Sequence, residues 1–280
     1  MKKNIAAGML SAIFLLFFSF ISNAQQAKVT ITINSLIARS SDACNGKMDF
    51  YAKVYIGHQL KTFPVREGND LRGLNWQFSV MVDLDTVNTL IEIWDEDDAI
   101  CGGGDDEVTV KGDLNKIRQP YSTSKSFTQH YTYWGSDRSG AEKGGISYTV
   151  TVEPTKPGLL TRVGWKLKKT EYKTGSGPWE ELIARPNPEC NNDDYFFYSK
   201  NFDFGSDQGA IICNPADPQR RVVGSWDFLA RETWLQIKLT DYRSAVLLYT
   251  VEKLDENNLV LTHKDVSHDV TTYTRSTYGH

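Results

Sequence analysis

Hydrophobic and polar residues alternate along most of the chain after residue 27. In KVTITIN (28–34), Val29, Ile31 and Ile33 fall on one face, and LNWQFSVMV (74–82) has the same spacing. A period of two is typical of a β-strand with one buried face. Other segments share this pattern: DFYAKVYIG, NTLIEIW, SFTQHYTYW and GGISYTVTVE, separated by turn-rich stretches such as PVREGNDLRG and GSDRSGAEKGG. The pattern predicts an antiparallel β-sandwich over 28–153.

A second strand-rich region follows a short break. EPTKPG contains two prolines and a glycine, which predicts a linker at 154–159. Beyond it lie further β-like runs: VGWKLKKTEY, YFFYSKNFDF, AIIC, VVGSWDFLA, TWLQIKL, AVLLYTVEKL and NLVLTHKD. Only PWEELIAR (178–185) suggests a brief helix. We therefore expect an all-β chain with a second domain at 160–280, which suits a length of 280 residues.

The first 24 residues have the features of a secretory signal peptide. Lys2 and Lys3 precede an apolar stretch that ends in Ser22-Asn23-Ala24, a small-x-small cleavage pattern. A single membrane anchor is the rival interpretation. The apolar run is shorter than the roughly 20 residues that a span needs, and no basic flank follows it. We expect cleavage after residue 24 and export of the mature protein.

The charge of the mature chain argues against a nucleic-acid partner. The whole chain has a formal net charge of −4, and removing the two lysines of the leader makes it −6. Binding to phosphate backbones requires a basic face, and no stripe of Lys and Arg with interleaved aromatics is present.

The sequence contains none of the common local catalytic motifs. It has no G-x-S-x-G elbow, H-E-x-x-H helix, P-loop or dinucleotide glycine fingerprint. The absence of these motifs does not rule out a catalytic triad assembled from distant residues, because triads are defined by geometry. We expect a binding protein rather than an enzyme.

The four cysteines are Cys44, Cys101, Cys190 and Cys213. Export permits disulfides, and four cysteines allow three pairings. The sequence by itself does not choose among them.

Two acidic stretches follow strand-like runs in the first domain. One is SSDACNGKMDFYAKVYIG and the other is WDEDDAICGGGDDEV. Charge runs of this kind are often solvated loops, and the alternative is the two halves of one metal site. With the strands around them, both stretches resemble the C2 domain, a calcium-binding β-sandwich, over about 28–153. Phe50 departs from the family, which usually has proline there, and the proline usual before the tryptophan is also absent.

The resemblance implies a calcium site formed by five carboxylates. Its ligands would be Asp42, Asp49, Asp95, Asp97 and Asp106, with Asp106 favoured over Asp105 because two residues separate it from the next strand. Independently of the family, calcium prefers oxygen ligands, and converging carboxylates repel one another unless a cation lies among them. The five histidines have no zinc-site spacing.

The loop placement that the resemblance implies also suggests roles for neighbouring residues. Cys44 and Cys101 would lie in the two calcium loops and pair with each other, which leaves Cys190 to pair with Cys213. Met48 and Ile100 would lie near the loop tips, where they are candidates for insertion into a membrane. Alternatively, Met48 and Ile100 are two isolated exposed apolar residues, which need no functional explanation.

The second domain resembles the lipocalin-like domains of exported bacterial proteins, over about residues 160–275. The similarity lies in VGWKL, in the two cysteines around an aromatic strand, and in Gly224-Ser225-Trp226. Gly164 is adjacent to Trp165, so the lipocalin G-x-W spacing occurs only at the second position. Such barrels either hold one small apolar ligand or are filled by their own side chains. The tryptophans are expected to be core or rim residues.

Two functions are therefore expected as alternatives. In the first, an exported calcium-binding protein uses the C2-like domain to bind phospholipid or another acidic ligand. In the second, calcium only stabilises the sandwich, and the lipocalin-like barrel binds a small apolar ligand.

Overall fold

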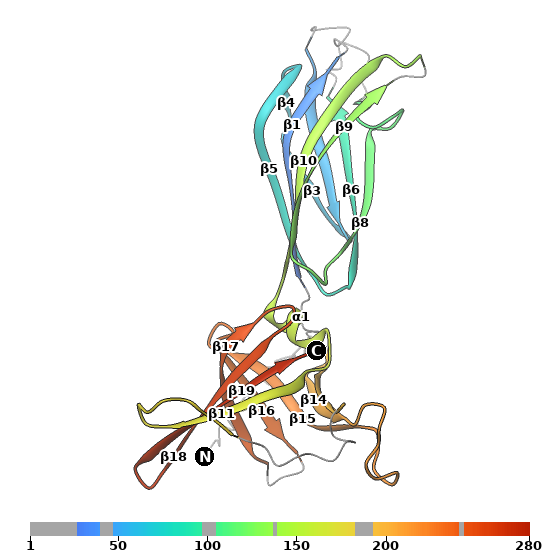
Figure 1. Cartoon of the computed structure of the whole chain (residues 1–280). Coiled ribbons are helices and arrows are strands. Elements are labelled where there is room, and N and C mark those ends of the chain that lie inside the picture. The colour runs from blue at the N-terminus through green and yellow to red at the C-terminus, as the bar shows by residue number, and fades with distance from the viewer. Residues whose placement is uncertain (1–26, 40–46, 97–104, 137–138, 183–192, 241–243) are drawn as a thin grey trace, which may run out of the picture.

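The computed structural model describes residues 27–39, 47–96, 105–136, 139–182, 193–240 and 244–280 (Figure 1). The predicted leader, residues 1–24, lies outside these ranges. Nearly every described element is a β-strand, so the expectation of an all-β chain is confirmed. In the described part of the chain, no helix is long and apolar enough to span a membrane.

Residues 27–154 form a sandwich of two antiparallel sheets (Figure 1). The four-stranded sheet has the order β5-β1-β10-β9, and in the other sheet β2 and β6 pair centrally. The strands are β1 (Ala27–Ala38), β2 (Asp49–Ile56), β3 (Gln59–Thr62), β4 (Arg66–Glu67), β5 (Asp70–Val82), β6 (Thr86–Asp95), β7 (Asp106–Glu107), β8 (Lys116–Ser122), β9 (Phe127–Ser136) and β10 (Glu142–Pro154).

The alternating apolar residues of both sheets form the sandwich core. Ile31 and Ile33 of β1 belong to one cluster with Ile91 and Ile93 of β6, and all four are almost fully buried. Burying such a side chain stabilises the fold by about 1.5–3 kcal/mol. The period-two pattern therefore defines the inward faces.

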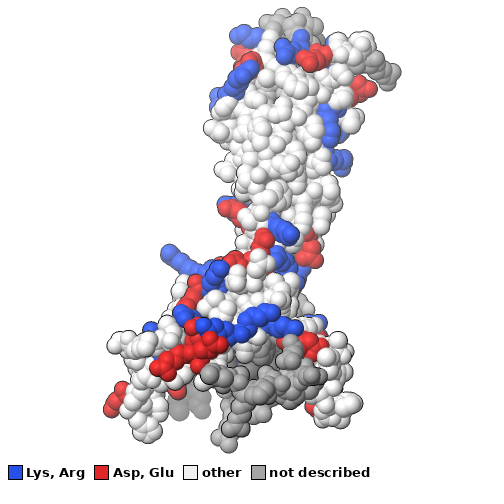
Figure 2. Space-filling model, in the orientation of Figure 1, with Lys and Arg blue, Asp and Glu red and all other residues white. Residues whose placement is uncertain are grey.

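Figure 2 shows where charge lies on the surface. In this view, Lys, Arg, Asp and Glu gather near the two ends of the sandwich and around its junction with the rest of the chain, and the broad face between carries few charges. Thr30 pairs with Thr151, and Thr32 with Thr149, across β1 and β10. Since Ile31 and Val150 alternate with them toward the core, these threonines lie on the outer face, where the Thr30 and Ser79 hydroxyls are hydrogen-bonded.

The segment expected to be a linker contains a short helix. After β10 ends at Pro154, Thr155 caps α1 (Lys156–Thr161) by accepting a hydrogen bond from the Gly158 amide. Proline in the first turn of α1 is compatible with a helix, because the first amides of a helix have no partner within it.

Polar contacts also join the sandwich to the second unit. Arg162 donates to the carbonyls of Ser124 and Glu256, and the Glu256 carboxylate accepts from the Ser126 amide at 3.0 Å. The Lys200 ammonium lies 3.1 Å from the Asp85 carboxylate. Side-chain contacts therefore support the connection in addition to α1.

The second unit is one nine-stranded antiparallel sheet. Its order is β12-β11-β19-β18-β17-β16-β15-β14-β13. The strands are β11 (Lys166–Thr174), β12 (Glu180–Glu181), β13 (Tyr195–Tyr198), β14 (Asp203–Asp207), β15 (Arg220–Leu229), β16 (Trp234–Leu239), β17 (Val246–Leu254), β18 (Leu259–Ser267) and β19 (Val270–Gly279).

This sheet curves so that the residue before β11 meets β13 at one isolated bridge. Trp165, immediately before β11, exchanges both backbone hydrogen bonds with Phe196 of β13, at 2.7 and 2.9 Å. Trp165 is fully buried, and its indole N–H donates to the Leu160 carbonyl at 2.9 Å. The end of α1 is thereby fixed against the point where the sheet meets itself.

Two local predictions in this unit are wrong. The apolar run AIIC predicts a strand, but Ala210 and Ile211 lie in a turn, where their amides donate to the Asp193 carboxylate. The stretch PWEELIAR predicts a helix, but Glu180 and Glu181 pair with β11 as a short strand. In both places side-chain or cross-strand hydrogen bonds override the local pattern.

Candidate functional site

Asp95 ends the row of inward-facing residues on β6. The core side chains Ile91 and Ile93 precede it on the same face, and Asp95 itself is only 4% exposed. Its Oδ1 accepts a hydrogen bond from the Asp49 amide at 2.6 Å. The start of β2 is thus bonded to a buried carboxylate at the end of β6.

Asp106 lies directly opposite Asp95. Antiparallel pairing of β6 with β7 sets Asp95 against Asp106 and Trp94 against Glu107. Residues opposite one another share a face of the sheet, so these two aspartates are neighbours. Like charges in this position destabilise a sheet, and a bound cation would remove that cost.

Asp105 has a different partner. It accepts a hydrogen bond from the Tyr51 hydroxyl at 2.6 Å. Burial and this hydrogen bond raise the pKa of Tyr51, so the phenol remains a donor. Tyr51 stacks with Trp94, and the Lys53 ammonium lies 4.8 Å from the Trp94 ring centre. Asp105 is held by the outward face of this sheet, whereas Asp106 pairs with Asp95.

The other three predicted ligands are not all accounted for. Asp49 opens β2, and strand alternation puts its side chain on the face opposite to that of Phe50 and the core. Asp42 and Asp97 lie outside the described residues. Among the residues that the structure describes, no three His, Cys, Asp or Glu side chains form a group that would hold a metal ion. The structure therefore brings together Asp95, Asp106 and the backbone of Asp49.

The prediction that Met48 lies at an exposed tip is wrong. Met48 is 8% exposed and belongs to the sandwich core, because it lies two residues before Phe50 and shares its inward face. Its amide donates to Asn69 Oδ1, and its carbonyl accepts from the Gly68 amide. Ile100, the other predicted tip residue, lies outside the described residues.

Cys213 is disulfide-bonded in the structure. The other three cysteines, Cys44, Cys101 and Cys190, lie outside the described residues. The predicted pairs therefore stay predictions.

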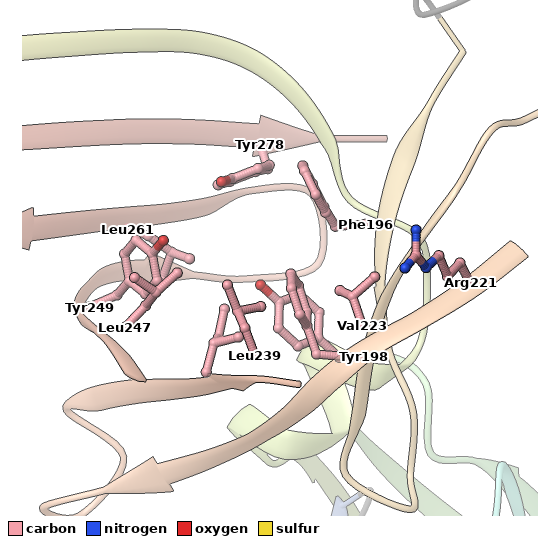
Figure 3. Close-up of a pocket in the computed structure, with 11 residues that line it drawn as sticks. Phe196, Tyr198, Arg221, Val223, Leu239, Leu247, Tyr249, Leu261 and Tyr278 are labelled. Atoms are coloured by element: carbon pink, nitrogen blue, oxygen red, sulfur yellow. The ribbon is translucent and has the colours of Figure 1, made fainter. Parts of the chain in front are cut away.

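A cavity of about 310 Å³ lies inside the curved sheet of the second unit (Figure 3). Its wall is mostly apolar and comes from seven strands, β13 to β19. The aliphatic and phenylalanine side chains that line it include Phe196, Phe204, Val223, Leu239, Leu247 and Leu261. A cavity of this size is at the lower end of the range of small-molecule sites, about 300–1,000 Å³.

Three tyrosines place hydroxyl groups in this apolar cavity. Figure 3 shows the hydroxyls of Tyr198, Tyr249 and Tyr278 directed toward the same space between the walls. Burial raises the pKa of Tyr249 to about 12 and, aided by the neighbouring phenols, raises the pKa of Tyr198 well above its usual value. Burial also raises the pKa of Tyr278, against a lowering hydrogen bond with Ser276. At neutral pH all three are protonated hydrogen-bond donors.

The tryptophans of the second unit do not form a cage around the cavity. Trp165 and Trp226 are buried in the core, and the Trp226 indole donates to the Ser199 carbonyl. Trp179 lies under Arg275, whose guanidinium carbon is 4.2 Å from its ring centre. The expectation that Trp165 and Trp226 are core residues is confirmed, and it is the tyrosines, not the tryptophans, that face the cavity.

No protein-family model and no curated protein matches the sequence. Solved structures with some similarity include a C2 domain of a plant extended synaptotagmin 1, with 11% identity, a TM-score of 0.34, and coverage of 48% of this chain and 97% of that chain. A structure described only as a C2 domain has 17% identity, a TM-score of 0.33, and coverage of 45% and 98%. A structure of two C2 domains of extended synaptotagmin 2 has 11% identity, a TM-score of 0.33, and coverage of 99% and 98%. Similarity at this level does not establish a function, and the fold of the sandwich follows from its own strand pairing.

Proposed function

We propose that the chain is an exported calcium-binding protein whose sandwich attaches to anionic phospholipid through bound calcium. The observation that carries the proposal is the buried Asp95 carboxylate opposite Asp106 at one end of the sandwich. Two acidic side chains facing one another in a sheet favour a cation between them.

The residues present fit calcium in their chemistry. Asp95 and Asp106 supply carboxylate oxygens, which are the ligands that calcium prefers. In this proposal Asp42 and Asp97 add further oxygens, as the C2 resemblance implies, and the Asp49 amide holds the Asp95 carboxylate in place. When bound, the ion would bridge the protein to phosphate groups, and the chain's own aspartates would set its position.

Liposome sedimentation tests the proposal. The full mature chain should sediment with phosphatidylserine vesicles in calcium and stay in the supernatant after chelation. Asp106→Asn should abolish calcium-dependent sedimentation, because it removes the charge while keeping the side-chain size. Asp83→Asn is the matched control, since Asp83 is an exposed aspartate at the opposite end of the sandwich. Equal sedimentation with and without calcium would contradict the proposal.

The cavity favours a second candidate function. We propose, as the alternative, that calcium only stabilises the sandwich and that the lipocalin-like second unit binds a small apolar molecule. The support is the tyrosine-lined cavity, which is mostly apolar and large enough for a ligand at the lower end of the usual range. Binding of 2-ethylnaphthalene, followed by fluorescence, would test this, and an absence of binding would contradict it.

A further inference from the structure

The walls of the cavity offer more than apolar surface. Tyr198 of β13 and Tyr249 of β17 come from strands separated by β14, β15 and β16, yet both hydroxyls are directed into the same space (Figure 3). Aliphatic side chains, including Leu239, Leu247 and Leu261, surround them. The sheet therefore presents two donors within an apolar site.

These two hydroxyls lack hydrogen-bond partners among the described residues. Other buried polar groups of the unit are bonded: the indoles of Trp165 and Trp226 each donate to a backbone carbonyl. The Tyr278 hydroxyl is the third in the cavity, and Ser276 acts against the rise in its pKa. A donor that faces an apolar cavity without a protein partner gains a hydrogen bond when a ligand supplies an acceptor there.

We propose that the cavity is specific for uncharged apolar molecules that carry a carbonyl-type acceptor, which the hydroxyls of Tyr198 and Tyr249 bind. This inference rests on the second candidate function and names its ligand class. Selection of this kind is effective because an analogue without the acceptor leaves the hydroxyls unpaired.

The apolar lining of the cavity also favours an uncharged ligand. A carboxylate that entered the apolar interior would lose its hydration, and the nearby groups there are neutral phenols. Arg221 lies on the exposed side of the cavity, away from the three hydroxyls (Figure 3). An acid held at Arg221 would therefore leave Tyr198 and Tyr249 unused.

Three probes with one ring system separate the possibilities. They are 2-acetylnaphthalene, its carbonyl-free counterpart 2-ethylnaphthalene, and the anion 2-naphthoate. With the full mature chain, a fluorescence titration should show 2-acetylnaphthalene binding roughly 3- to 10-fold more tightly than 2-ethylnaphthalene, the value of about one net hydrogen bond. The anion should bind most weakly.

Variants identify the groups responsible. Tyr198→Phe and Tyr249→Phe should each reduce the preference for the ketone, and together they should abolish it, with 2-ethylnaphthalene binding at least as tight as in the unchanged chain. Tyr172→Phe is the matched control, because Tyr172 is exposed and bonds to Glu180 on the sheet exterior. Retained binding of 2-ethylnaphthalene would also show that the variants are folded.

Each outcome has a distinct meaning. If neither neutral probe binds, the apolar-ligand function itself is wrong. If both bind equally, the cavity binds apolar molecules but the inference about the two hydroxyls is wrong. If 2-naphthoate binds most tightly, the ligand is an acid held by Arg221, and the inference is again overturned.

Discussion

Residues 27–154 and residues 162–280 differ in what fills the space between their strands. Among the described residues, the sandwich core contains 26 buried hydrophobic residues in one cluster, whereas the cluster of the second unit contains nine, Leu160 of α1 included. Tyr249 and Leu247 are only partly buried beside the cavity. The two parts are of similar length, so the difference lies in the packing. A filled interior leaves no space for a ligand inside, and the sandwich has its aspartates at one end of its surface. A curved sheet with internal space can bind within.

The largest effect should come from the contact that closes the curved sheet. Trp165→Ala removes a fully buried indole, and we expect it to lower the free energy of unfolding of the second unit by about 3–5 kcal/mol. Native-state hydrogen exchange should show faster exchange in β13 and β19 and unchanged exchange in β1 and β10. Trp134→Ala, at an exposed tryptophan of the sandwich, is the control. Equal acceleration in both parts would show that they unfold as one unit.

Loss of a disulfide should have the next largest effect on stability. Peptide mapping without reduction should show Cys190 joined to Cys213 and Cys44 joined to Cys101. Reduction of a native disulfide should cost about 2–4 kcal/mol, and for Cys213 the loss should appear in the second unit alone. A bond between Cys213 and Cys44 or Cys101 would contradict the division into two domains.

Calcium should stabilise only the sandwich. At a calcium concentration ten times the dissociation constant, binding to the native state should add roughly 1.4 kcal/mol. Differential scanning calorimetry should show that chelation lowers the transition of the sandwich and leaves that of the second unit in place. Asp106→Asn should remove the calcium effect. A shift of both transitions would mean that the ion, or its effect, extends across the junction.

The smallest effect concerns the turn between β17 and β18. The Asp255 carboxylate accepts from the Asn257 and Asn258 amides, and these amides and Lys253 lower its pKa. A lowered native pKa means that the stabilisation is present above the usual aspartate pKa of about 4 and is lost as the pH falls toward the native value. Asp255→Ala should therefore cost about 1 kcal/mol at pH 6 and less at pH 2. Urea unfolding at both pH values measures this, with Asp265→Ala as control; a pH-independent difference would contradict it.

The sequence pattern anticipates the strands that have one apolar face and misses those that do not. β8 contains Pro120, and β19 is rich in threonine and tyrosine, so neither has clear alternation of hydrophobic residues. AIIC is apolar but lies in a turn, because Asp193 binds the backbone amides there. Hydrogen bonds between distant residues determine such segments, and a local pattern does not contain them.

The two sites differ in how far the sequence reveals them. Asp95 and Asp106 lie in a conspicuous acidic stretch, and a family resemblance is enough to place them near one another. The same resemblance misplaces Met48. It lies two residues before Phe50 and so shares its buried face, although it is close to a loop. The sequence does not decide whether the second unit is filled or hollow. The lining of the cavity comes from strands far apart in the chain. The signal that the sequence offers is an apolar residue two positions before each tyrosine, Phe196 before Tyr198 and Leu247 before Tyr249.

The helix between the two parts also affects the distance between the aspartate end of the sandwich and the cavity. The aspartate end of the sandwich lies far from the second unit (Figure 1), and β1 extends along this axis for 12 residues, roughly 40 Å at strand spacing. With α1 capped by Thr155 and Arg162 bonded across the junction, the sandwich serves as a spacer of set length. If the aspartate end binds a surface, the sandwich would therefore hold the cavity at a constant distance from it. At that distance the cavity could not take up its ligand directly from the surface.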